Sequence, residues 1–141
     1  YVFNGQLIKG FHVTFKDGRV VEHGADEGAE LLGRLLDTDE GARSIGEVAL
    51  VPASSPINRS GALFYSTLFD ENAACHIAFG ASYPGTTENG TRLSKDELLV
   101  LGVNDSAVHE DVMVGAPDMT ITGTTRTGEN VKIFENGEWA F

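Results

Sequence analysis

The chain has 141 residues, with 10 Lys and Arg against 21 Asp and Glu, a formal net charge of −11 and 41% hydrophobic residues. This length corresponds to one domain, which can bury about 68–70% of its unfolded surface without a disulfide or a structural zinc. The acidic balance argues against binding nucleic acid, because phosphates are neutralised by basic patches, and equally against anionic membranes. The longest apolar stretch, Val48–Ala53, is far shorter than the roughly 20 residues that span a bilayer. The single cysteine cannot form an intramolecular disulfide, which fits a reducing compartment.

The first third of the chain predicts a hairpin followed by a helix. Gln6–Phe15 has the spacing of a strand, Asp17-Gly18 is a strong hairpin turn signal, and Val20–His23 is the returning strand. The apolar period then changes to that of a helix, which we expect over residues 26–37. A second short turn is expected at Asp39–Arg43.

The middle third is less regular. Ile45–Pro52 is a short apolar run that predicts a buried strand containing Glu47, and 54–61 has the composition of a loop. The Ala-rich segment 70–80 predicts a helix capped by Asp70 and stopped by Gly80. Residues 83–92 form a polar loop that we expect to be mobile, and Lys95–Leu99 predicts a short helix.

The last third predicts strands. Val108–Val114 alternates, Thr120–Thr124 follows, and Val131–Phe134 leads through an Asn-Gly turn at 136–137 to Trp139. The whole chain therefore predicts a strand-rich α+β domain with a few helices.

Among the carboxylates, Glu47 and Glu71 stand apart from those in polar segments. Glu47 lies within an apolar run, where a buried carboxylate costs several kcal/mol unless it is paired or bound to metal; a solvent-facing Glu47 on a half-exposed strand is an equally good interpretation. Glu71 and His76 lie five residues apart on the predicted helix, about 500° of rotation, so they do not share a face. His76 can be a metal ligand or a hydrogen-bonded core histidine.

The pair His109 and Asp111 gives a sharper indication. Residues i and i+2 of a strand point to the same face, so these two side chains project together while Glu110 points away. A histidine beside a carboxylate on rigid backbone is half of a divalent cation site. With Glu47, Glu71 and His76, the set reaches the ligand count of a two-metal centre.

Two nucleophilic alternatives fit less well. A Ser55–His109–Asp111 triad would need a relay between side chains that project in parallel, and the chain has no G-x-S-x-G turn. Cys75 beside His76 lies in an apolar run, which favours a buried, inert thiol.

Several blocks strongly resemble the bacterial metallo-aminopeptidases of the aminopeptidase T, aminopeptidase S and PepS type. The resemblance covers essentially the whole chain, including the closing Val131–Trp139 hairpin, and 69–80 is its longest specific block. The blocks are Gly46-Glu-Val-Ala-Leu-Val-Pro52, Ser55-Pro-Ile57, Gly61-Ala-Leu-Phe-Tyr65, Leu68-Phe-Asp-Glu-Asn-Ala-Ala-Cys-His-Ile-Ala-Phe-Gly80 and Asn104-Asp-Ser-Ala-Val-His-Glu-Asp-Val-Met-Val-Gly115.

This resemblance implies a catalytic domain of the thermophilic metalloprotease type with a cocatalytic pair of divalent ions (Zn, Co, Mn or Mg). By position it implies that Glu47 is a bridging ligand and that Tyr83 lies beside the metals. The implied ligands are Glu47, Glu71, His76, His109 and Asp111, and the implied catalytic residues are Tyr83 and Glu71.

The resemblance also implies an aminopeptidase that removes N-terminal residues from peptides by metal-activated water. Glu71, where it is not a ligand, would accept the water's proton, and Tyr83 would donate a hydrogen bond to the oxyanion. Family members are cytoplasmic homodimers, so we expect the same of the full-length enzyme.

Two departures from the family pattern qualify these expectations. Val112 stands where the family usually has Phe, a change that we expect to be benign. No segment matches the family's upstream G-E-V-F-T-like block, which supplies another glutamate ligand. We therefore expect residues 1–141, which open on Tyr1 without an initiator Met, to be the C-terminal portion of a catalytic domain, without its N-terminal α/β domain and one ligand. The alternative function is an inactive folded fragment or a metal-binding module.

Overall fold

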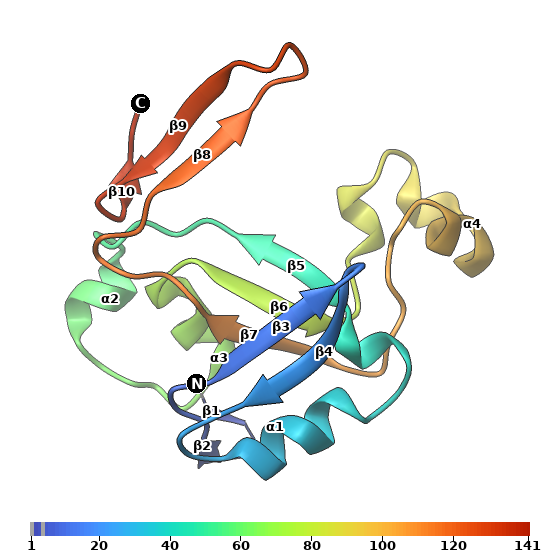
Figure 1. The fold of residues 1–141 in the computed structure, drawn as a ribbon, viewed down its shortest axis with the longest axis horizontal. Helices are drawn as coiled ribbons and strands as arrows, with labels where there is room; N and C mark the ends of the chain where they lie inside the picture. The colour runs from blue at the N-terminus through green and yellow to red at the C-terminus, as the bar shows by residue number, and fades with distance from the viewer. Residues whose placement is uncertain (1, 4) are drawn as a thin grey trace. The chain divides into compact units, whose positions relative to one another are not determined.

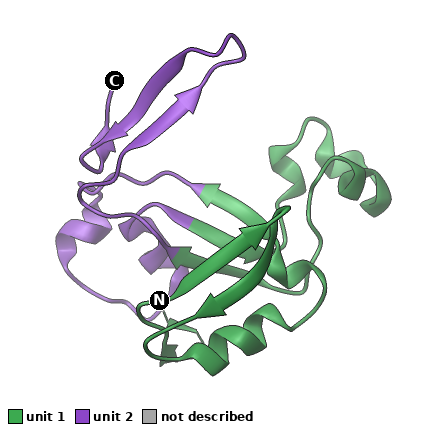
Figure 2. Cartoon of the chain, viewed as in Figure 1, with its two compact units in different colours: residues 1–48, 77–112 green, residues 49–76, 113–141 purple. Residues whose placement is uncertain are grey.

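The computed structural model describes residues 2–3 and 5–141, which separate into two compact units (Figure 2). Unit 1 comprises residues 1–48 and 77–112, and unit 2 comprises residues 49–76 and 113–141. The boundaries fall inside three strands that form one sheet, in the order β5-β6-β7. These strands are β5 (Ile45–Ala49), β6 (His76–Gly80) and β7 (His109–Met113) (Figure 1). Most of their residues belong to unit 1 (Figure 2).

Unit 1 begins with two hairpins. The short pair β1 (Val2–Phe3) and β2 (Gln6–Leu7) is antiparallel, as is the pair β3 (His12–Lys16) and β4 (Arg19–Gly24). The predicted Asp17-Gly18 turn is confirmed, with φ of 51° and 78°, the left-handed values that a two-residue hairpin turn needs. The prediction of a single strand over Gln6–Phe15 is wrong, because the strand is interrupted at Gly10, where φ is +58°.

Helix α1 (Ala29–Leu36) lies within the predicted range and supplies the core of unit 1. Its leucines pack with residues from three other elements, including Phe79 of β6 and Val112 of β7. The buried cluster is Ile8, Val20, Leu31, Leu32, Leu35, Leu36, Phe79 and Val112. Val112 is fully buried there and serves packing; that its replacement of Phe is benign stays a prediction.

The remaining helical segments of unit 1 are short. They are the 3₁₀ turn η1 (Gly41–Arg43), the turns η3 (Pro84–Thr86) and η4 (Gly90–Arg92), and helix α4 (Lys95–Val100). The predicted turn after Asp39 and the predicted short helix are both confirmed. Ser94 and Glu97 begin α4 with a reciprocal capping box.

The prediction of a helix over 70–80 is wrong. A short helix α3 (Thr67–Asp70) continues into the 3₁₀ turn η2 (Glu71–Ala73), and the chain then becomes the strand β6. Asp70 does not cap the predicted helix, because its carboxylate accepts hydrogen bonds from the amides of Phe64 and Ser66. Pairing within the sheet outweighs the helix propensity of the alanines, which is a weak local preference.

Strand β5 lies where the sequence places it, but it is not a buried strand. Val48 is 67% exposed and Ile45 is also exposed, whereas Glu47 is half-buried. The apolar composition of 45–49 therefore does not mean that both faces of this strand are buried.

Unit 2 contains a helix in place of a predicted loop. Helix α2 (Pro56–Ser60) begins at Ser55, whose hydroxyl accepts a hydrogen bond from the Asn58 amide, and it ends at Gly61 with φ of +64°. Proline in the first turn and glycine after the last are typical of a helix.

The C-terminal strands β8 (Ile121–Thr124), β9 (Asn130–Glu135) and β10 (Glu138–Trp139) form an antiparallel sheet in the order β10-β9-β8. The predicted Asn136-Gly137 turn is confirmed by φ values of 52° and 73°. The ring of Phe134 meets that of Trp139 edge-on, 4.5 Å between centroids. Ten strands and a few short helices among the described residues confirm the strand-rich α+β class.

Candidate metal centre

Strands β5 and β7 bring three of the predicted ligands together within unit 1. His109 and Asp111 lie on the same face of β7, with 3.7 Å between His109 Nε2 and Asp111 Oδ1. Glu47 of β5 reaches the same point, with 3.4 Å between its Oε2 and His109 Nε2. The i, i+2 argument therefore describes the geometry of this pair correctly.

A hydrogen bond to the main chain holds the His109 ring in one orientation. Its Nδ1 lies 2.7 Å from the carbonyl oxygen of Ala81. A carbonyl can only accept a hydrogen bond, so Nδ1 donates to Ala81, and Nε2 is the ring nitrogen that faces the two carboxylates and is left to bind a cation. A main-chain carbonyl behind a histidine is a common support for metal-ligating imidazoles. Tyr83 lies against this ring, with 4.7 Å between ring centroids.

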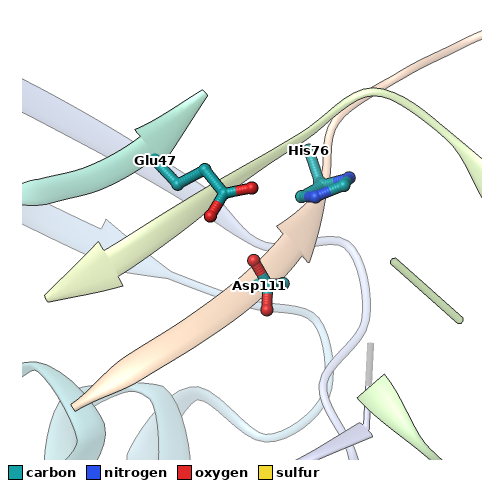
Figure 3. Close-up of side chains that lie close together, drawn as sticks. All are labelled: Glu47, His76 and Asp111. Atoms are coloured by element: carbon teal, nitrogen blue, oxygen red, sulfur yellow. The ribbon is translucent and has the colours of Figure 1, made fainter. Parts of the chain in front are cut away.

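His76 is the third member of a group of possible ligands with Glu47 and Asp111. It is the first residue of β6 and is bonded directly to Ile77 of unit 1. Ligand atoms of Glu47, His76 and Asp111 all lie within 4.8 Å of one another (Figure 3). The Nδ1 of His76 lies 3.0 Å from the carbonyl oxygen of Ala74, which again leaves Nε2 as the atom that can bind a cation. Both His76 and Asp111 are buried, 4% and 6% exposed.

The charges of this cluster fit a cation. Two carboxylate oxygens no more than 4.8 Å apart repel by at least about 3 kcal/mol at an effective dielectric constant near 20. A divalent ion between them reverses the sign of that interaction, and carboxylate oxygens with imidazole nitrogens are ligands that Zn²⁺, Co²⁺ and Mn²⁺ accept.

Glu110 lies on the opposite face of β7, as the alternation predicts. Its neighbours in that direction, Val108 and Val112, belong to the core of unit 1. Its Oε1 is buried and has no hydrogen-bond partner among the described residues. Burial, followed by the charge of Asp111, raises the pKa of Glu110 to about 7, and His109 offsets part of that rise.

The other residues that the sequence singles out have different surroundings. Glu71 lies in η2, within unit 2, and is not a member of the three-residue group found among the described residues. The hydroxyl of Ser55 donates to the Asn72 carbonyl and caps α2, so it serves the fold rather than a triad. Cys75 is buried, with Sγ 3.3 Å from both the amide and the carbonyl of Val51.

Comparison with known proteins identifies the family. A model of the thermophilic metalloprotease (M29) family matches residues 1–139. The chain belongs to this family. Membership of the M29 metalloproteases implies a divalent metal, in agreement with the cluster of Glu47, His76 and Asp111.

Named relatives of the M29 chain are aminopeptidases. It is 57% identical over 139 residues to Aminopeptidase 2 of Geobacillus stearothermophilus, and 48% identical over 136 residues to Aminopeptidase T of Thermus aquaticus. These alignments cover 99% and 96% of this chain but 34% and 33% of the relatives. A solved structure, wild-type AmpT from Thermus thermophilus, is 45% identical with a TM-score of 0.90, over 99% of this chain and 34% of that one.

This M29 chain therefore spans about a third of the length of the relatives it matches. Within residues 2–3 and 5–141, no helix has both the length and the apolar character needed to cross a membrane.

Sequence reasoning misses the main-chain part of this M29 site. The carbonyls of Ala74 and Ala81 orient the two histidines, and neither is visible in a list of side-chain types. One signal was available, because Ala74 lies two residues before His76, within reach of the histidine's own ring.

Proposed function

We propose that this chain forms the metal-binding part of an aminopeptidase that removes N-terminal residues from peptides by means of metal-activated water. The observation that carries the proposal is the convergence of Glu47 and Asp111 on two histidines, with His109 3.4 Å and 3.7 Å from them and His76 in a group whose ligand atoms lie within 4.8 Å. The names of the M29 relatives point to the same activity.

The arrangement favours two ions rather than one. Glu47 and Asp111 each approach both histidines, so they would be shared, while His76 would bind one ion and His109 the other. Two imidazoles make Zn²⁺, Co²⁺ or Mn²⁺ better candidates than Mg²⁺, which prefers oxygen ligands. Bound ions of this kind lower the pKa of a water molecule and polarise the scissile carbonyl.

Two further residues would act on the substrate in this proposal. The Glu71 carboxylate would accept a proton from the attacking water, a general-base role typically worth 10²–10⁴-fold in rate. The Tyr83 hydroxyl, on a ring packed against His109, would donate a hydrogen bond to the tetrahedral oxyanion. Removing such a donor commonly costs about 3–4 kcal/mol.

The acidity of the chain is consistent with peptide substrates. A net charge of −11 favours the free α-ammonium group that an aminopeptidase must recognise. A cytoplasmic location agrees with the single unpaired cysteine. The homodimer and a further glutamate ligand from outside these residues are predictions that rest on the family resemblance.

The second candidate function is a folded fragment that binds metal without catalysis. The share of the relatives that this chain spans, about a third, favours this alternative for the 141 residues alone. In that case the complete polypeptide would carry the peptidase activity.

Metal titration tests the metal site on which both functions depend. We expect calorimetry with Co²⁺ or Zn²⁺ to show two ions bound to the wild-type chain, and Asp111→Asn to lose both because its carboxylate is shared. Asp96→Asn, on exposed helix α4, removes the same charge elsewhere and should bind like wild type. If the wild-type chain binds no ion, and a longer protein containing it cleaves no aminoacyl p-nitroanilide, the aminopeptidase proposal is wrong.

A further inference from the structure

Asn104 lies in the loop before β7 and connects two segments of unit 1 through its side chain. Its Nδ2 donates to the carbonyl of Gly41, 2.9 Å away, and to the carbonyl of Gly80, 2.5 Å away. Gly41 begins η1 and Gly80 ends β6. The amide group therefore bridges the turn before β5 and the end of β6.

The main chain of Asn104 adds a second connection to the segment after β6, at Ser82. The Ser82 amide donates to the Asn104 carbonyl at 2.9 Å, and the Asn104 amide donates to the Ser82 hydroxyl at 3.3 Å. Together with the side-chain bond to Gly80, Asn104 contacts residues on both sides of Ala81. The three residues 80–82 are thus fixed at both ends.

The segment held in this way supplies the support of His109. Ala81 donates its amide to the Val108 carbonyl at 2.6 Å and accepts from His109 Nδ1 at 2.7 Å. Gly80 permits this close approach, since a side-chain Cβ there would lie 2.1 Å from the Val108 carbonyl oxygen. Tyr83, which packs on the His109 ring, follows directly after Ser82.

We propose that Asn104 is a positioning residue for His109, holding the Ala81 carbonyl in the place that fixes the Nδ1–H tautomer and aims Nε2 at Glu47 and Asp111. The inference rests on the proposed metal site and deepens it, because it assigns the orientation of one ligand to a residue whose own hydrogen bonds are with Gly41, Gly80 and Ser82. Asn104 acts on His109 only indirectly, through the Ala81 carbonyl that lies between its contacts Gly80 and Ser82, so it is not itself catalytic.

The chemistry of the contacts requires an amide at this position. Both partners of Nδ2 are carbonyl oxygens, which need two N–H donors from one atom. Aspartate has nearly the same shape but offers only acceptors, so Asn104→Asp would place a carboxylate against two carbonyls. Asn104→Ser can donate one hydrogen bond and provides a milder change.

Two measurements test the proposal. Nitrogen-15 NMR of the His109 ring in EDTA at pH 8 reports which ring nitrogens carry a proton. Titration with Co²⁺ reports the affinity of each ion. Asn58→Asp is the matched control, because Asn58 also donates through Nδ2 to a carbonyl, that of Ala53, but within unit 2.

We expect a single Nδ1–H tautomer of His109 in wild type and in Asn58→Asp, and a mixture of tautomers in Asn104→Asp. We also expect Asn104→Asp to bind one of two ions at least about tenfold more weakly, within the range seen when groups supporting a ligand are removed. Asn104→Ser should change both quantities in the same direction by less, and it replaces Asn104→Asp if that variant does not fold.

An unchanged tautomer in both Asn104 variants, with both Co²⁺ affinities within twofold of wild type, would overturn the inference. Failure of the proposed function gives a different result, since wild type would then bind no Co²⁺. The tautomer measurement does not depend on metal, so it tests the role of Asn104 in either case.

Discussion

Gly46 provides the sharpest mutational test of how the site is built. A Cβ atom at this position would lie 2.2 Å from the Ala81 carbonyl oxygen and 2.7 Å from that of Gly80. Real Cβ atoms essentially never come closer than 3.0 Å to another heavy atom. Gly46→Ala therefore requires β5 and the 80–81 segment to separate by about 0.8 Å. A change of side-chain rotamer cannot relieve the contacts, because both are with main-chain atoms.

This displacement affects Glu47, the next residue, and the carbonyl that orients His109. Overpacking of this size typically costs about 1–3 kcal/mol of stability. Metal–ligand distances tolerate only about ±0.2 Å, so a shift of about 0.8 Å should weaken metal binding by tenfold or more. Urea unfolding in EDTA measures the stability, and Co²⁺ titration measures the affinity.

Gly85→Ala is the matched control for this substitution, because the nearest atom to its Cβ would be 4.0 Å away. We expect it to leave the metal affinity unchanged. If Gly46→Ala behaves like Gly85→Ala in both measurements, the close approach of β5 to the 80–81 segment does not set the position of Glu47.

Three further predictions concern stability and reactivity. Glu110→Gln should flatten the pH dependence of the unfolding free energy measured in EDTA. The pKa of Glu110 is about 7 in the folded state against 4.5 for the free group, so the unfolded state ionises first, and the unfolding free energy of wild type falls by up to about 3 kcal/mol between pH 4.5 and 7. The variant lacks this fall, and equal slopes for the two proteins would contradict the prediction. Phe79→Ala, at a fully buried core position, should cost about 3–5 kcal/mol in urea unfolding, and a loss below 1 kcal/mol would show that Phe79 does not anchor the core. Cys75, which is 4% exposed, should react with a thiol reagent only as fast as the protein opens, and rapid labelling of native protein would contradict its burial.

The features that depend on local chemistry could be predicted from the sequence. The turns at Asp17-Gly18 and Asn136-Gly137 need left-handed backbone, which these residues adopt readily. The face shared by His109 and Asp111 follows from the two-residue period of a strand. Each of these involves residues close together in the chain.

The features that depend on distant pairing could not be predicted. The alanines before His76 favour a helix locally, but β6 gains its hydrogen bonds from a sheet with strands about 30 residues away on either side. Helix α2 was missed for a different reason. Its signals, Ser55-Pro56 at the start and Gly61 at the end, resemble a loop by composition and indicate a helix only by their order.

The candidate site combines both cases. The resemblance implies Glu47, Glu71, His76, His109 and Asp111 as ligands. The structure brings Glu47, His76, His109 and Asp111 toward one another. The carbonyl of Ala81 and the amide of Asn104 act through geometry that only the folded chain creates.

The most direct test of the central claim is a zinc-edge anomalous difference map from crystals of the chain grown with Zn²⁺. The proposal predicts two peaks that share Glu47 and Asp111, one bound to His76 Nε2 and the other to His109 Nε2. A map with no peak at these four residues, or with zinc only at other histidines such as His12 or His23, would contradict it.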